Sequence, residues 1–135
     1  MLKKRKTNIM GYELVAAIFV IIMLDKVIPQ QVCIQHYIEN QSAKHSVFAG
    51  FSRQPDMNEL VGMLWHTAAH RSHTYWAERV QSEANLADAP SRQDCRLLKR
   101  SGGCELELDL RLFTMAAEKW RRNVRECKIA PLRRP

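Results

Sequence analysis

The hydrophobic pattern of the chain is strongest near its start, where residues 9–26 are apolar on almost every side of a helix. Such a helix is usually buried by its neighbours, so we expect a core helix here. A membrane or signal segment is the alternative, because Lys3-Lys4-Arg5-Lys6 precedes the apolar run over residues 14–24. That run is shorter than the roughly 20 residues that cross a bilayer, and no small-residue cleavage site follows it.

A strand and a short helix follow this first segment. Val32–Ile38 predicts a strand with apolar residues on both of its faces. This pattern is typical of a sheet that is covered on both sides. Residues 41–51 predict a short helix that ends near Gly50, because glycine suits the left-handed position after a helix.

The next segment predicts a longer helix and a second strand. Asp56 is a suitable N-cap, Glu59 completes a capping box, and the apolar period continues to about His70. Thr74–Val80 has the composition of a strand and leads into a polar loop. Strands that alternate with helices favour an α/β fold.

The pattern changes after residue 92. Residues 96–100 predict a turn of helix, and Gly102-Gly103 predicts a break. Glu105–Leu112 alternates strictly between leucine and charged residues, which predicts an edge or half-buried strand. Thr114–Lys128 is typical of a basic amphipathic helix.

The composition fits one small domain with a hydrophobic core and additional terminal segments, since 46% of the 135 residues are hydrophobic and 26% are charged. The net charge of +7 favours an anionic partner, either nucleic acid or an acidic membrane surface. The alternative is that much of this charge only makes the two tails soluble.

The cysteines and histidines do not predict a zinc site. The 4 cysteines, at positions 33, 95, 104 and 127, include no close pair, and we expect reduced thiols in an intracellular protein of the cytoplasm or nucleus. His66 and His70 have the i, i+4 spacing of a zinc pair but no H-E-x-x-H context.

Four sequence blocks together resemble one family. The run from Trp76 to Arg92, with its "W-x-E-R-V-x-S-x-x-N-x-A-D-x-P-S-R" pattern, is similar to the closing motif of the ribonuclease H-like domain of retroelement polyproteins. The other blocks, in the same order, are Glu13-Leu14-Val15-Ala16-Ala17, Glu39-Asn40-Gln41-Ser42-Ala43, and Gly50-Phe51-Ser52 with residues 56–68.

The resemblance implies a fold and a division of the chain. The expected fold class is α/β, a ribonuclease H-like mixed sheet flanked by helices that lacks the family's opening hairpin strands. The expected parts are a basic arm over residues 1–8, a partial ribonuclease H-like domain over residues 9–92, and a basic extension over residues 93–135.

The resemblance also implies an active site. Glu13, Glu39 and Asp88 match metal-binding carboxylates, which would bind two Mg²⁺ or Mn²⁺ ions for hydrolysis of RNA in RNA–DNA hybrids. Asn40, Arg79 and Arg92 are expected to contact nucleic acid. The expected partners are an RNA–DNA hybrid and the rest of a reverse transcriptase polyprotein, with no small-molecule cofactor.

Two departures from the family weaken the expected catalysis. The family's first carboxylate lies on the opening hairpin, where this chain has only the basic arm, and a glutamate stands at position 39 where the family has aspartate. We therefore expect weak or lost activity. The alternatives are a non-catalytic basic nucleic-acid-binding remnant and a small membrane-associated protein.

Overall fold

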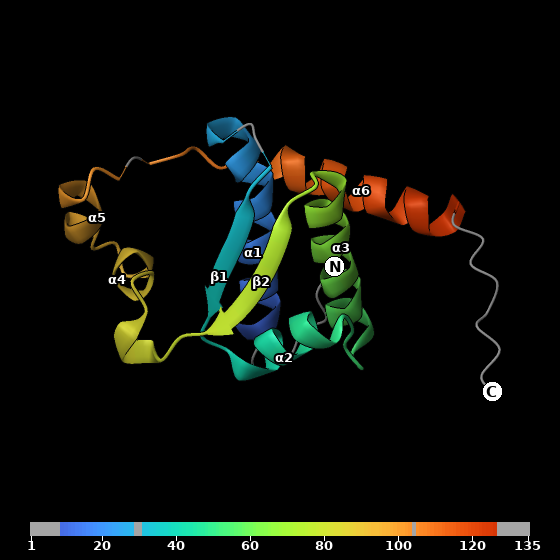
Figure 1. Cartoon of the computed structure of the whole chain (residues 1–135), viewed down its shortest axis with the longest axis horizontal. Helices are drawn as coiled ribbons and strands as arrows, with labels where there is room; N and C mark the ends of the chain where they lie inside the picture. The colour runs from blue at the N-terminus through green and yellow to red at the C-terminus, as the bar shows by residue number, and fades with distance from the viewer. Residues whose placement is uncertain (1–8, 29–30, 104, 127–135) are drawn as a thin grey trace.

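The computed structural model describes residues 9–28, 31–103 and 105–126, so the predicted basic arm and the last residues of the chain lie outside it. Figure 1 shows the elements in chain order. They are α1 (Ile9–Val27), β1 (Cys33–Ile38), α2 (Gln41–Ala49), α3 (Pro55–His70), β2 (Thr74–Arg79), a short 3-10 turn η1 (Ser82–Ala84), α4 (Asp88–Ser91), α5 (Arg96–Arg100) and α6 (Leu110–Glu126).

Within the described residues the sheet is a parallel pair, β1 and β2, in register from Cys33 opposite Thr74 to Ile38 opposite Arg79. Parallel neighbours need a crossover connection, and here α2 and α3 supply it. Both strands therefore end on the same side, close to α2 in Figure 1. The α/β class predicted from the sequence is confirmed at this level.

Helix α1 is buried, as the sequence predicted. It lies behind the strand pair in Figure 1, and Leu14, Ile18 and Ile21 are all 0% exposed. Phe19 also stacks on Phe113 of α6, with ring centroids 5.0 Å apart. No helix in the described part of the chain combines the length and apolar character that a membrane span requires.

Among the described residues the sheet is covered on one face only, whereas the sequence predicted cover on both. Ile34 and Tyr75 point into the core, whereas Cys33, Tyr37 and Trp76 are exposed on the other face. The prediction failed because cysteine, tyrosine and tryptophan were counted as apolar residues, although they also occur on solvent-exposed surfaces. Trp76 is 52% exposed on this face.

The boundaries of α1, α2 and α5 agree with the sequence to within two residues, whereas α3 and α6 start earlier than predicted. Gly50 ends α2 in the left-handed conformation, with φ of 73°, as predicted. Asp56 is not the N-cap of α3, because Gln54 takes that position and Pro55 follows it in the first turn. Proline suits the first helical position, where its missing N–H costs nothing, and this moves the boundary back.

The predicted strand over residues 105–112 is wrong. The described residues from 105 to 109 adopt no regular structure, and α6 begins at Leu110. Leu106 and Leu108 are about half exposed, and within the described ranges no strand lies beside them. From Leu112 onward an apolar stripe packs against the core, and this helical docking prevails over the alternating pattern. The stripe is Leu112, Phe113, Ala116, Ala117 and Trp120.

Ile18→Ala should destabilise the chain by about 2–5 kcal/mol, because the substitution leaves a cavity in the core. Val20→Ala is the matched control, since Val20 lies on the same helix and is 46% exposed, and its effect should stay below about 1 kcal/mol. Urea unfolding followed by circular dichroism measures both. Equal small effects for the two variants would show that α1 is not packed in the core.

Candidate functional site

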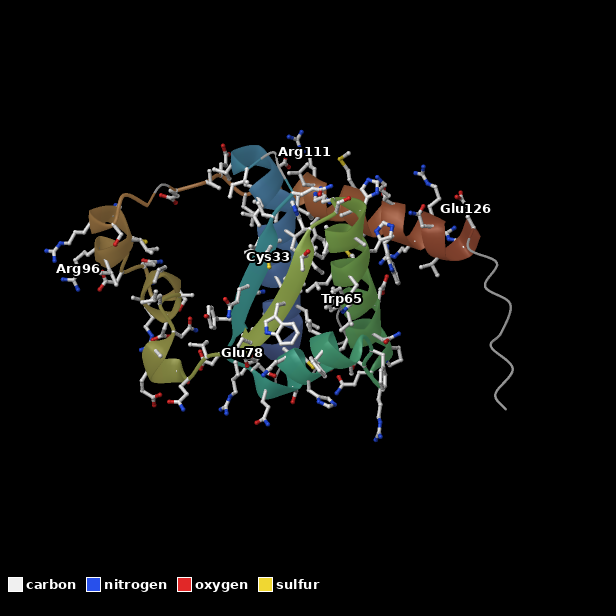
Figure 2. All side chains as sticks on the ribbon, in the orientation of Figure 1. Cys33, Trp65, Glu78, Arg96, Arg111 and Glu126 are labelled. Carbon is white, nitrogen blue, oxygen red and sulfur yellow. The ribbon has the colours of Figure 1, made fainter. Side chains whose placement is uncertain are left out.

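The carboxyl ends of β1 and β2 bring together the segments that carry the predicted acids. Glu13 comes from α1, Glu39 follows β1, and Asp88 begins α4 after the loop that leaves β2. The carboxyl ends of parallel strands are the usual place for a site in an α/β protein. Glu78 is labelled near this end of β2 in Figure 2.

Glu13 links α1 to the end of β1. Both of its carboxylate oxygens accept a hydrogen bond from the backbone N–H of Asn40, each at 3.1 Å. Burial raises the pKa of the Glu13 carboxyl above its ordinary value, the Asn40 N–H opposes this shift, and the negative charge of Glu39 adds to it. Glu13 lies beyond the first turn of α1, so helix-dipole stabilisation does not explain its position.

Glu39 accepts hydrogen bonds from the loop after β2. Its Oε1 accepts from the Ser82 hydroxyl at 2.5 Å, and its Oε2 accepts from the Asn85 side-chain amide at 3.0 Å. These two bonds lower the pKa of Glu39, and the positive charge of Arg92 lowers it further. The loop is thereby attached to the end of β1, and Glu39 is not the free surface charge that its position alone suggests.

Asp88 interacts chiefly with Arg92. The two side chains form an i, i+4 ion pair, with 3.2 Å between Asp88 Oδ2 and an Arg92 guanidinium nitrogen. Because the Arg92 charge also acts on Glu39, the guanidinium is the positive group shared by the two acids. Ser91 donates to the Asp88 carbonyl, so these residues also stabilise a local turn.

The predicted nucleic-acid contacts have different surroundings. Asn40 uses its side chain to cap α2, accepting from the Ala43 N–H at 2.9 Å. Arg79 is exposed at the end of β2, and Arg92 has a 76% exposed side chain. The two arginines are therefore accessible to a ligand, whereas the Asn40 amide oxygen is already engaged.

Sequence reasoning missed two pairings at this end of the sheet. Ser82 lies inside the recognised motif, yet only the fold reveals that it binds Glu39. Lys44 of α2 pairs with Glu78 of β2 at 2.6 Å and, with other bonds, lowers the pKa of Glu78 to about 2. Partners this far apart in sequence leave no local signal.

The carboxylates suit a divalent ion in kind but not in their present arrangement. Hard cations such as Mg²⁺ prefer oxygen ligands. In this structure the oxygens of Glu13, Glu39 and Asp88 accept from the protein's own donors. Among the described residues, no group of three or more histidine, cysteine, aspartate or glutamate side chains is placed to hold a metal ion.

Comparison with known proteins adds no family: no family model, curated protein or solved structure matches this chain. The ribonuclease H-like resemblance therefore rests on the sequence blocks alone.

Glu13→Gln should flatten the pH dependence of stability. Because the pKa of Glu13 is raised by folding, its stabilising contribution is present below the ordinary value of 4.5 and is lost as pH rises through the raised pKa. Glutamine keeps an acceptor for the Asn40 N–H without the buried charge. Urea unfolding between about pH 4 and pH 7 checks this, with the exposed Glu83→Gln as control. A variant less stable than the parent at pH 7 would contradict the effect.

Arg92→Gln should raise the affinity for Mn²⁺ by about tenfold, because it removes the cation that neutralises Glu39 and Asp88. Isothermal titration measures this affinity. Arg96→Gln is the matched control, since Arg96 pairs with Asp94 in a similar exposed turn away from the sheet. The gain should vanish in Glu39→Gln/Arg92→Gln, and equal Mn²⁺ affinity in parent and Arg92→Gln would show that Arg92 does not compete with an ion.

Proposed function

We propose that the chain is a ribonuclease H-like domain derived from a retroelement polyprotein, in which hydrolysis of the RNA strand of RNA–DNA hybrids is weak or lost. The observation that carries the proposal is the hydrogen-bonded cluster at the strand ends. Three segments far apart in the sequence meet there through Glu13, Glu39 and the Asp88–Arg92 pair. These are the acids that the four sequence blocks select.

The free energy that this cluster costs the folded state supports a functional origin. A partly buried carboxylate beside a second acid lowers stability at neutral pH, and such arrangements concentrate at functional sites. Structural ion pairs perturb pKa values too, but the hydrogen-bond partner of Glu13 here is a backbone N–H and not a cation. Mg²⁺ or Mn²⁺ is the ion that the ancestral chemistry would use to activate water and stabilise the leaving oxygen.

The same cluster accounts for weak or lost catalysis. Ser82, Asn85 and Arg92 occupy the carboxylate oxygens that an ion would need. The family's first carboxylate also has no counterpart among the recognised blocks. Hybrid binding requires less than cleavage, since backbone contacts from exposed arginines such as Arg79 and Arg92 suffice for it.

A non-catalytic nucleic-acid-binding role is the second candidate, and helix α6 favours it. Arg122 and Arg125 are exposed on this helix, whose polar face is strongly basic. Lys and Arg on one helix face attract phosphate backbones without sequence preference. In this case the binding surface is α6 and the acidic cluster is only a structural remnant.

Fluorescence anisotropy with a labelled RNA–DNA hybrid separates the two candidates. Arg79→Gln/Arg92→Gln should weaken hybrid binding and reduce its salt dependence by about one unit of slope per lost phosphate contact. Arg122→Gln/Arg125→Gln, which removes the same charge from α6, should have the smaller effect. The opposite ranking would contradict the proposed site and favour the second candidate.

Cleavage is measured on the same labelled hybrid with Mg²⁺ or Mn²⁺. We expect turnover far below the enzymatic range of about 1–10³ s⁻¹, and any residual cleavage should disappear in Asp88→Asn. Turnover within that range would contradict the loss of activity. Residual cleavage that persists in Asp88→Asn would come from a different site or a contaminant.

A further inference from the structure

A pair of histidines faces α6 from the end of α3, away from the acidic cluster. His66 and His70 line a pocket of about 360 Å³ together with Lys119 of α6. Because β2 starts just after α3 ends, this pocket is close to the amino ends of the strands. Figure 1 shows α6 crossing that end of the molecule, opposite α2.

Both histidines present a nitrogen lone pair to α6. The side-chain amide nitrogen of Asn123 lies 2.8 Å from His66 Nε2. The Lys119 ammonium contacts His70 Nε2. Amide nitrogens and ammonium groups only donate hydrogen bonds, so each Nε2 accepts one. The two imidazoles are therefore neutral with the proton on Nδ1, and a neutral imidazole is the form that binds a metal ion.

The i, i+4 spacing places the two rings side by side on one surface of α3. The rings are parallel, with an interplanar angle of 2° and centroids 6.1 Å apart. A metal–imidazole bond is about 2.0–2.1 Å long, so two Nε2 atoms on one ion lie within about 4 Å of each other. Rotation of the two side chains from their parallel arrangement is therefore part of binding.

The end of α3 is a fixed platform for a cation. Thr67 lies between the two histidines, is 2% exposed and donates its hydroxyl proton to the Met63 carbonyl at 2.7 Å. His70 is the last residue of α3, and the negative end of the helix dipole favours positive charge there. Ligands carried on a packed helix are held more precisely than ligands on a loop.

We propose that His66 and His70 together bind a divalent late first-row transition-metal ion, such as Ni²⁺, Cu²⁺ or Zn²⁺. Imidazole nitrogen suits these ions, whereas Mg²⁺ prefers oxygen ligands. The ion takes the two lone pairs that now accept from Asn123 and Lys119, and the exposed Lys119 side chain turns to solvent. Two ligands form an open chelate, unlike a structural zinc site with four protein ligands. The site is independent of the acidic cluster and of the function proposed for it.

Ni²⁺ can locate the site, because this paramagnetic ion broadens the NMR signals of nearby groups. The full chain is titrated with Ni²⁺ at neutral pH while NMR follows the imidazole signals of the five histidines. We expect the strongest broadening at His66 and His70, and none with Mg²⁺. Broadening that is equal at all five histidines, or strongest at another one, overturns the proposal.

Single substitutions test whether both rings bind the same ion. His66→Gln and His70→Gln should each weaken Ni²⁺ binding by about tenfold or more in isothermal titration, because each removes one of two linked ligands. His45→Gln is the control, since His45 is exposed on α2, and it should bind as the parent does. Circular dichroism checks that each variant folds, and if one does not, the other decides. Parent affinity in a folded His66→Gln or His70→Gln overturns the proposal.

The pH dependence of binding gives a second check. Burial, the neighbouring imidazole of His70 and the charge of Lys119 lower the pKa of His66, so its neutral form persists to lower pH than usual. Ni²⁺ binding should still be lost as the pH falls from about 7.5 to about 5, because protonated imidazole has no free lone pair. Affinity at about pH 5 equal to that at about pH 7.5 overturns the proposal.

Stability gives a third check, because an ion that binds only the folded chain stabilises it. Saturating Ni²⁺ should raise the free energy of unfolding of the parent in urea, and this gain should disappear in His66→Gln/His70→Gln. Equal stabilisation of the parent and the double variant overturns the proposal.

Discussion

Burial of α1 is the interaction on which the rest of this structure depends. Its side chains fill the space between the strand pair, α3 and α6, and Leu14, Ile18 and Ile21 are fully buried there. A sheet of two strands is marginal by itself and needs a helix on its face. Packing of α1 therefore fixes the strand pair, and it also fixes where Glu13 emerges, one residue before the first buried leucine.

At its position near the carboxyl end of the sheet, the charged form of Glu13 is electrostatically unfavourable. Burial and Glu39 both disfavour its charge, while the Asn40 N–H compensates in part. The loop is held through Ser82, Asn85 and Arg92 on neighbouring acids. The groups that hold this end together also occupy the carboxylate oxygens that the proposed metal ions would need.

The two ends of the molecule carry different kinds of side chain. Carboxylates gather where the strands end, whereas His66, His70, Arg71 and Lys119 gather near the start of β2. Docking of α6 on α1 and α3 creates the second of these clusters, because Lys119 comes from α6 and the other three residues belong to the end of α3. The segment after residue 92 thus contributes to the core through its apolar stripe.

The sequence by itself determined the elements whose cause is local. The uniformly apolar α1, the left-handed Gly50 after α2 and the three acids that match the sequence blocks were all accessible without coordinates. Tertiary structure alone decided the exposed face of the sheet, the helical start of α6 at Leu110 and the pairings of Glu39 with Ser82 and Asn85. The reason is physical. Alternating leucines give a segment one apolar face if it forms a strand, but the surface on which the segment docks determines which conformation forms and which side chains are buried.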